Sequence, residues 1–97
     1  MPGIIIEGSR AATLAVSGTG ATTGALPRGT YDVWCDVDVW IRVDDTTLGS
    51  PDRPQDVTTA NGYKIFAGNV IPVEVGDARA IGAIAGGAGT LSYHKTA

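Results

Sequence analysis

Residues 30–45 read TYDVWCDVDVWIRVDD, which is the longest regular pattern in the chain. Apolar side chains fill every second position on one face: Tyr31, Val33, Cys35, Val37, Val39, Ile41 and Val43. The positions between them carry Asp32, Trp34, Asp36, Asp38, Trp40, Arg42 and Asp44. Because successive side chains of a strand point to opposite faces of a sheet, this alternation predicts a β-strand with one face in the core.

The predicted strand is unusually long. Strands in globular proteins usually have about 5 to 6 residues, whereas this one would have about 14. A bulge or bend near its middle is therefore expected, and Asp36–Asp38 is the candidate position.

Length and composition favour one small β-domain. The chain has 97 residues, of which 43% are hydrophobic and 18% charged, so it is expected to fold. Its 14 glycines and 5 prolines suit tight turns between short strands. We expect an all-β, single-domain antiparallel β-sandwich or jelly-roll-like barrel of about seven to nine short strands. Residues 1–25 would form an N-terminal strand or arm and a flexible loop, and residues 26–97 the core sandwich.

The N-terminal part contains two short apolar runs and a glycine-rich stretch. Ile4–Ile6 is long enough for one strand, which could pair with its own sheet or with the edge of a neighbouring subunit. A weak strand is expected near Thr13–Val16. Gly18–Gly24 lacks the spacing of a dinucleotide-binding loop and is interpreted as a flexible loop.

Five further strands are predicted in the second half of the chain. Asn61–Gly62 lies between two β-forming runs, which is the strongest short signal for a hairpin. Pro72 cannot donate to a sheet, so its strand is expected at an edge or a bulge. The expected segments are Val57–Ala60 paired with Tyr63–Phe66, then Val70–Val75, Ala78–Ala85 and Thr90–His94.

Charge and hydropathy argue against two classes of partner. The formal charge is -3, and the 7 Lys and Arg residues are scattered, so nucleic-acid binding is not expected. No apolar run approaches the roughly 20 residues of a transmembrane helix, so no membrane partner is expected. The start, MPGIIIEGSR, lacks the pattern of a signal peptide, and synthesis and folding are expected in a reducing cytoplasm.

No catalytic or metal-binding motif is recognisable, so we expect no enzyme, cofactor or metal site. The one histidine, His94, is interpreted as an exposed or packing residue. The one cysteine, Cys35, lies on the apolar face, where it would act as a small hydrophobic residue. Asp36 and Asp38 lie on one face, and they fit either a solvated acidic surface or a structural cation such as calcium.

Trp34 and Trp40 stand out on the aspartate-bearing face, because large indoles are rarely left in water without a partner. A bulge could turn one of them into the core, or a loop or second sheet could cover them. The other interpretations are a protein interface and a carbohydrate-stacking platform.

Two runs, LPRGTYDVWCDVDVWIRV at 26–43 and YKIFAGNVIPVEVGDARAIGAIAGGAGTLSYHK at 63–95, carry a resemblance. In the similar proteins, Gly-Thr-Tyr leads into a strand with a D-V-x-I-R centre, here Asp38, Val39, Ile41 and Arg42. A later strand pair ends in a glycine turn before Gly-Thr-Leu, here Gly89, Thr90 and Leu91. From Leu26 to Tyr93 the chain thus resembles small β-rich virion proteins of tailed bacteriophages, which include capsid decoration (cement) proteins and minor head or tail components.

The resemblance implies a non-enzymatic virion structural protein, most specifically a capsid decoration protein. Such a protein is made in the host bacterial cytoplasm, forms a homo-oligomer, commonly a trimer, and binds the major capsid protein on the outer surface of the head. The alternatives are a phage neck or tail component and a carbohydrate- or receptor-binding β-module that uses Trp34 and Trp40. The candidate interface residues are Ile4, Ile5, Ile6, Trp34 and Trp40.

Overall fold

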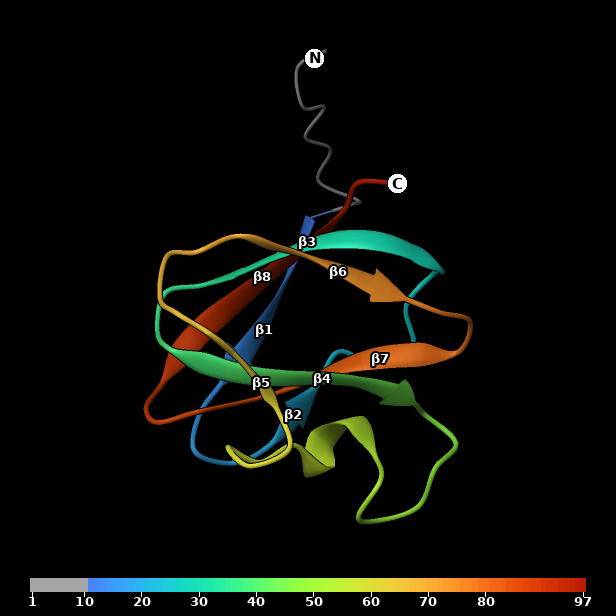
Figure 1. Cartoon of the computed structure of the whole chain (residues 1–97), viewed down its shortest axis with the longest axis horizontal. Helices are drawn as coiled ribbons and strands as arrows, with labels where there is room; N and C mark the ends of the chain where they lie inside the picture. The colour runs from blue at the N-terminus through green and yellow to red at the C-terminus, as the bar shows by residue number, and fades with distance from the viewer. Residues whose placement is uncertain (1–10) are drawn as a thin grey trace.

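The Thr30–Asp45 stretch forms two strands that lie in different sheets of the computed structural model, which describes residues 11–97 (Figure 1). Strand β3 covers Gly29–Cys35 and strand β4 covers Val39–Asp45. The chain turns at Asp36–Asp38, so the predicted bend is confirmed. This bend is a corner at which the chain passes from one sheet to the other.

The described residues form eight strands and one 3-10 helix, which are joined by turns and loops. The expected all-β fold is therefore confirmed. Apart from β3 and β4, the elements are β1 (Ala11–Val16), β2 (Ala21–Thr22), η1 (Pro54–Asp56), β5 (Tyr63–Ile65), β6 (Ile71–Val75), β7 (Arg79–Ala85) and β8 (Gly89–Lys95).

The strands form two four-stranded antiparallel sheets packed as a β-sandwich. The first sheet has the order β1-β8-β3-β6 and the second the order β2-β7-β4-β5. The pairs include β1 with β8, β2 with β7, β3 with β6 and β4 with β5. The chain is therefore paired like one long hairpin whose tip is the β4–β5 connection, and every link except that one crosses between the sheets.

The interior of the sandwich contains the side chains that the alternation assigns to the core. Tyr31, Val33 and Cys35 from β3 and Val39 and Ile41 from β4 are each at most 4% exposed. The phenol of Tyr31 donates a hydrogen bond to the carbonyl oxygen of Pro27 at 2.6 Å, which satisfies its polar group. The remaining buried residues of this core are Val16, Ile65, Val75, Ile81, Ala83, Ala85 and Leu91.

The two aspartates of the corner tie it to two other connections. The Oδ1 atom of Asp36 accepts a hydrogen bond from the backbone N–H of Thr90 at 2.8 Å, at the start of β8. The Oδ1 atom of Asp38 accepts one from the backbone N–H of Ala67 at 2.8 Å, in the β5–β6 connection. Both side chains therefore satisfy backbone donors that the sheet ladders leave unpaired.

Helix η1 packs on the outer face of the second sheet. Gly82 lies between two core residues of β7, so its α-carbon faces away from the core. A Cβ atom added at Gly82 would overlap the carbonyl oxygen of Pro54, and one added at Gly20 would overlap that of Gln55. Glycine at these two positions is what allows the helix to lie directly on the sheet.

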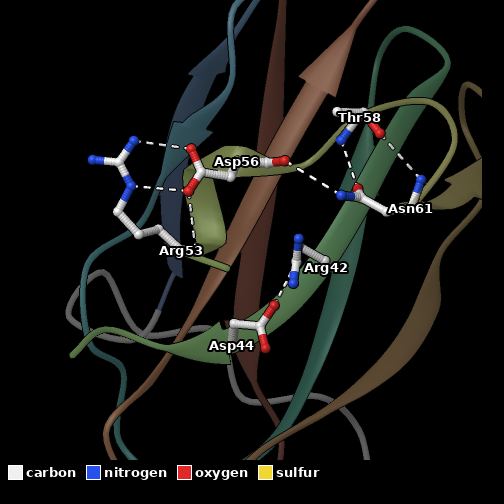
Figure 2. A network of polar contacts seen from close by, with 6 residues as sticks. All are labelled: Arg42, Asp44, Arg53, Asp56, Thr58 and Asn61. Carbon is white, nitrogen blue, oxygen red and sulfur yellow. Dashed lines mark hydrogen bonds and ion pairs between the residues drawn. The ribbon is translucent and has the colours of Figure 1, made fainter. Parts of the chain in front are cut away.

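A bidentate ion pair holds η1 in shape (Figure 2). The guanidinium of Arg53 donates to both carboxylate oxygens of Asp56 at 2.9 Å, and the Arg53 backbone N–H donates to the same carboxylate at 3.1 Å. Because Arg53 hydrogen-bonds the charged form, the pKa of the Asp56 carboxyl lies below its usual range.

The hairpin predicted across Asn61–Gly62 is wrong. Val57–Ala60 forms no strand, because the Oδ1 atom of Asn61 accepts a hydrogen bond from the Thr58 backbone N–H at 2.6 Å and folds the segment into a local turn (Figure 2). Tyr63–Ile65 instead pairs with β4. The Asn-Gly pair thus belongs to a turn stabilised by the Asn61 side chain and does not connect two paired strands.

The other predicted strands are found close to their expected bounds. The Val70–Val75, Ala78–Ala85 and Thr90–His94 segments correspond to β6, β7 and β8, and the weak strand near Thr13–Val16 corresponds to β1. Strand β6, which contains Pro72, is an edge strand as expected. The interpretation of Gly18–Gly24 as a flexible loop is wrong in part, because Ala21–Thr22 forms strand β2 and pairs with β7. These two residues lie among glycines and carry no strand pattern.

Candidate interaction surfaces

Trp34 lies on the outer face of the first sheet, where it is 38% exposed. The register places Trp34 opposite Ser92 on β8, and Ser92 opposite Thr13 on β1. Val70, which is 58% exposed, lies beside Trp34 in the same shallow hollow of about 320 Å³. The indole and Val70 form an exposed apolar pair on a sheet face that is otherwise largely polar.

Polar side chains of β3, β8 and β1 line the same hollow and form a rim beside the pair. We call the pair and this rim the Trp34 surface. On the rim, Asp32 of β3 lies directly opposite His94 of β8. Ser92 and Thr13 continue the rim toward the β1 edge. An aromatic group inside a ring of polar groups is the arrangement found at the centre of many protein interfaces. His94 is thus placed beside Trp34, a neighbourhood that requires the β3–β8 pairing and was not predicted.

Trp40 lies on the outer face of the second sheet and is half-buried. The ammonium of Lys64 lies 5.2 Å from the Trp40 ring centroid and 4.7 Å from that of Phe66, which is 57% exposed. These distances fit cation–π contacts with both rings. Gly62 packs against Trp40, because a Cβ added at Gly62 would lie 2.8 Å from the Trp40 Cβ. The backbone at Gly62 therefore packs against the base of this side chain.

The two indoles belong to separate surfaces. Trp34 precedes the corner and Trp40 follows it, so the outer faces of different sheets carry them. Neither is in the core. The two side chains accordingly do not form one flat platform. The third candidate interface, Ile4, Ile5 and Ile6, lies outside the described residues.

The aspartates of the corner are engaged in hydrogen bonds rather than grouped together. Asp36 and Asp38 accept backbone N–H groups, and Asp38 also lies 3.8 Å from the ammonium of Lys64. Asp44 forms an ion pair with Arg42 on the same strand (Figure 2). Within residues 11–97, no three His, Cys, Asp or Glu side chains come together in a way that could hold a metal ion.

A second hollow of about 430 Å³ opens between the two sheets at the β5–β6 edge of the sandwich. Its walls are mostly aliphatic, and Tyr63, which is 67% exposed, stands at its mouth. We call it the edge groove. Its lining residues are Ile41, Arg42, Val43, Tyr63, Ile71, Pro72 and Val73. No sequence signal pointed to this groove, because it depends on which strands end at the same edge.

Cys35 is fully buried in the core, as its place on the apolar face predicts. Burial raises the pKa of its thiol, and this effect outweighs the backbone hydrogen bonds that lower it. The nearby charge of Asp36 acts in the same direction as burial. The thiol is therefore held in its protonated, unreactive form.

No helix within residues 11–97 has the length and apolar character needed to cross a membrane. No protein-family model, no curated protein and no solved structure matches the chain. The exposed surfaces and the sequence resemblance are therefore the basis for inferring a function.

Proposed function

We propose that the chain is a non-enzymatic virion structural protein, and most specifically a capsid decoration (cement) protein of a tailed bacteriophage. It binds the major capsid protein on the outside of the head and stabilises the assembled shell. Two observations support the proposal: the resemblance over Leu26–Tyr93, and exposed apolar groups on a sandwich whose connections are tied together by side chains.

The strand order supports a jelly roll, a fold found among viral capsid and lectin domains. Pairing β1 with β8, β2 with β7, β3 with β6 and β4 with β5 is the pattern of one long hairpin rolled into two sheets. We infer that the sandwich is of this kind. Because a fold hosts many functions, the jelly roll supports the proposed virion function together with the Trp34 surface.

The Trp34 surface is the single observation on which the proposal mainly rests. Trp34 and Val70 expose apolar area inside a polar rim that includes Asp32 and His94. Such a pair can bury its apolar area against a flat partner while the rim excludes water. A partner that offers this complementary patch many times, as a capsid does, would carry many copies of the chain.

A decoration protein also needs its binding surface to be held rigidly, and the hydrogen bonds of the corner support this. Asp36 ties β3 to β8, and Asp38 ties β4 to the β5–β6 connection. The end of the sandwich that carries Trp34 is therefore braced. A protein that binds the assembled shell but not free subunits stabilises the shell by mass action, and it needs no reactive group to do so.

The experiment is to purify virions of the phage that encodes the chain, quantify the protein by mass spectrometry and locate it by electron cryomicroscopy. We expect many copies on the head surface, arranged with the symmetry of the capsid lattice. Density only at the neck or tail would favour the alternative of a neck or tail component. Absence of the protein from purified virions would contradict both.

A carbohydrate-binding module is a second candidate, and one observation favours it. The Trp34 indole shares its hollow with the hydroxyls of Thr13 and Ser92 and with Asp32 and His94, which could hydrogen-bond a sugar stacked on the ring. A glycan array with the wild-type chain and a Trp34→Ala variant tests this. Glycan binding that the variant abolishes would support the module, whereas absence of binding on the array would remove it.

A further inference from the structure

Strand β4 has an incomplete edge beside the edge groove. On one side, β7 pairs with all of Val39–Asp45. On the other side, β5 pairs only with Val39–Ile41, and no other described strand continues along Arg42–Asp45. The Asp45 carbonyl oxygen accepts the Leu48 N–H at 3.3 Å, and the other backbone groups on this side of the stretch are available for a further strand.

The groove next to this edge offers the apolar half of a strand-binding site. Ile41 and Val43 of β4 form one wall, and Ile71 and Val73 of β6 form the other. Val43, Ile71 and Val73 are only partly buried, although they pack against the core. A strand added to β4 over Arg42–Asp45 would direct every second side chain into this space.

We propose that the edge groove binds the Ile4–Ile6 strand of a second copy of the chain. Three consecutive β-branched residues favour an extended strand. In that strand, Ile4 and Ile6 share one face and enter the groove, while the backbone of the segment pairs with β4. This inference concerns self-association of the chain and holds whether or not the protein decorates a capsid.

The second copy is preferred to the chain's own segment because of reach. Ala11 pairs with His94, His94 with Asp32 and Asp32 with Pro72, so Ala11 lies three strand spacings from β6. At about 4.8 Å per spacing this is roughly 14 Å. The five Cα–Cα steps from Ile6 to Ala11 span about 17 Å when fully extended. A segment that fills the groove of its own chain must therefore cross almost straight over, with about one residue to spare and too few for a turn.

Strand direction adds a second reason. Strand β1 is parallel to β3, because both are antiparallel to β8. Strand β3 ends at the corner, and β4 starts there and runs back in the opposite direction. β1 therefore begins at the end of the sandwich where β4 finishes. If Ile4–Ile6 of the same chain lay in the groove, Ile6 would lie nearest to the end where β4 finishes, so the segment would run parallel to β4. Every described strand pair is antiparallel. A segment from a second copy is free to run antiparallel, which is the more stable pairing.

Sedimentation equilibrium of the full chain tests the proposal. We expect the wild type to associate reversibly above its monomer mass of 9.9 kDa. An Ile4→Ser/Ile6→Ser variant, which lacks the strand, and a Val73→Arg variant, which lacks the groove, should each associate at least tenfold more weakly. Leu48→Ser removes an exposed apolar group that does not line the groove and should leave association unchanged. Near-ultraviolet circular dichroism checks that each variant is folded.

Mixing the two defective variants gives the sharper readout. The Val73→Arg chain retains the strand and the Ile4→Ser/Ile6→Ser chain retains the groove, so the mixture should form a heteromer that neither variant forms alone. A wild-type chain that stays at 9.9 kDa at every concentration would overturn the proposal. So would a mixture of folded variants that remains monomeric.

Discussion

The carboxylate of Asp36 accepts the backbone N–H of Thr90 at 2.8 Å, which links the end of β3 to the start of β8 across 54 positions of sequence. The same Oδ1 atom lies 3.9 Å from the Sγ atom of Cys35. One surface side chain thus fixes the point at which the chain leaves the first sheet. Its removal should loosen the corner rather than the core.

Asp36→Ala is therefore expected to lower the free energy of unfolding by about 1.5 kcal/mol, the low end of the range for a hydrogen bond to a charged group, because this bond lies at the surface. Asp36→Asn keeps an acceptor oxygen and should lose less. Asp52→Ala, at an exposed loop position, is the control. Urea denaturation measures all three, and equal stabilities for Asp36→Ala and Asp52→Ala would contradict the role given to the corner.

Gly82→Ala should be among the most destabilising single changes to the second sheet. Its new methyl group would collide with the backbone of Pro54, so η1 must lift from the sheet. We expect a loss of about 3 kcal/mol, the upper part of the range for overpacking. At Gly87 an added Cβ meets no atom within 4 Å, so Gly87→Ala is the matched control and should change stability by less than about 0.5 kcal/mol. A Gly82→Ala variant with wild-type thermal stability would show that η1 does not pack as described.

Stability should fall in acid through Asp45 and Asp56. Hydrogen bonds from Thr47 lower the pKa of Asp45, and hydrogen bonds from Arg53 lower that of Asp56. A carboxyl whose pKa is lower in the folded state than in the unfolded state stabilises the fold above the unfolded value, about 3.9. That contribution is lost as the pH falls through the folded pKa.

Thermal unfolding of the wild type and of Asp56→Asn between about pH 2 and pH 7 measures this effect. The wild type should be the more stable of the two at neutral pH, and the difference should shrink below about pH 4. A difference that stays constant across the whole range would mean that the Asp56 carboxylate adds nothing through its charge.

Cys35 should react with a thiol reagent only when the protein unfolds. Its side chain is 0% exposed, and burial raises its pKa, so the thiolate is scarce in the folded state. Labelling with a disulfide reagent at about pH 8, near the ordinary thiol pKa, should be slow for the native chain and fast in denaturant. Fast labelling under native conditions would mean that the core opens at the corner more readily than its packing implies.

The alternation in Thr30–Asp45 predicts the core better than it predicts the path of the chain. The apolar alternation continues through the corner at Cys35, Val37 and Val39, because the inner faces of both sheets line one shared core. One long strand and two strands joined by a corner therefore have the same pattern. Only the unusual length of the run indicated a bend.

The candidate surfaces depend on strand order, which local patterns do not specify. Trp34 meets Ser92 and Asp32 meets His94 because β8 lies beside β3, a pairing between residues about 60 positions apart in the chain. The edge groove exists because β5 stops at three residues. The Asn61–Gly62 signal failed for a different reason, since the Asn61 side chain turned the backbone locally.

Binding of the purified chain to phage heads that lack it tests the central claim most directly. Bound copies are counted after sedimentation of the heads, for the wild type, for Trp34→Ala and for Leu48→Ala as an exposed control. We predict saturation by the wild type and the control at a fixed number of copies per head. Trp34→Ala should bind about 30-fold more weakly, as expected for the loss of about 2 kcal/mol at an interface hot spot. A wild-type chain that does not bind heads, or a folded Trp34→Ala variant that binds as tightly as the wild type, would contradict the account.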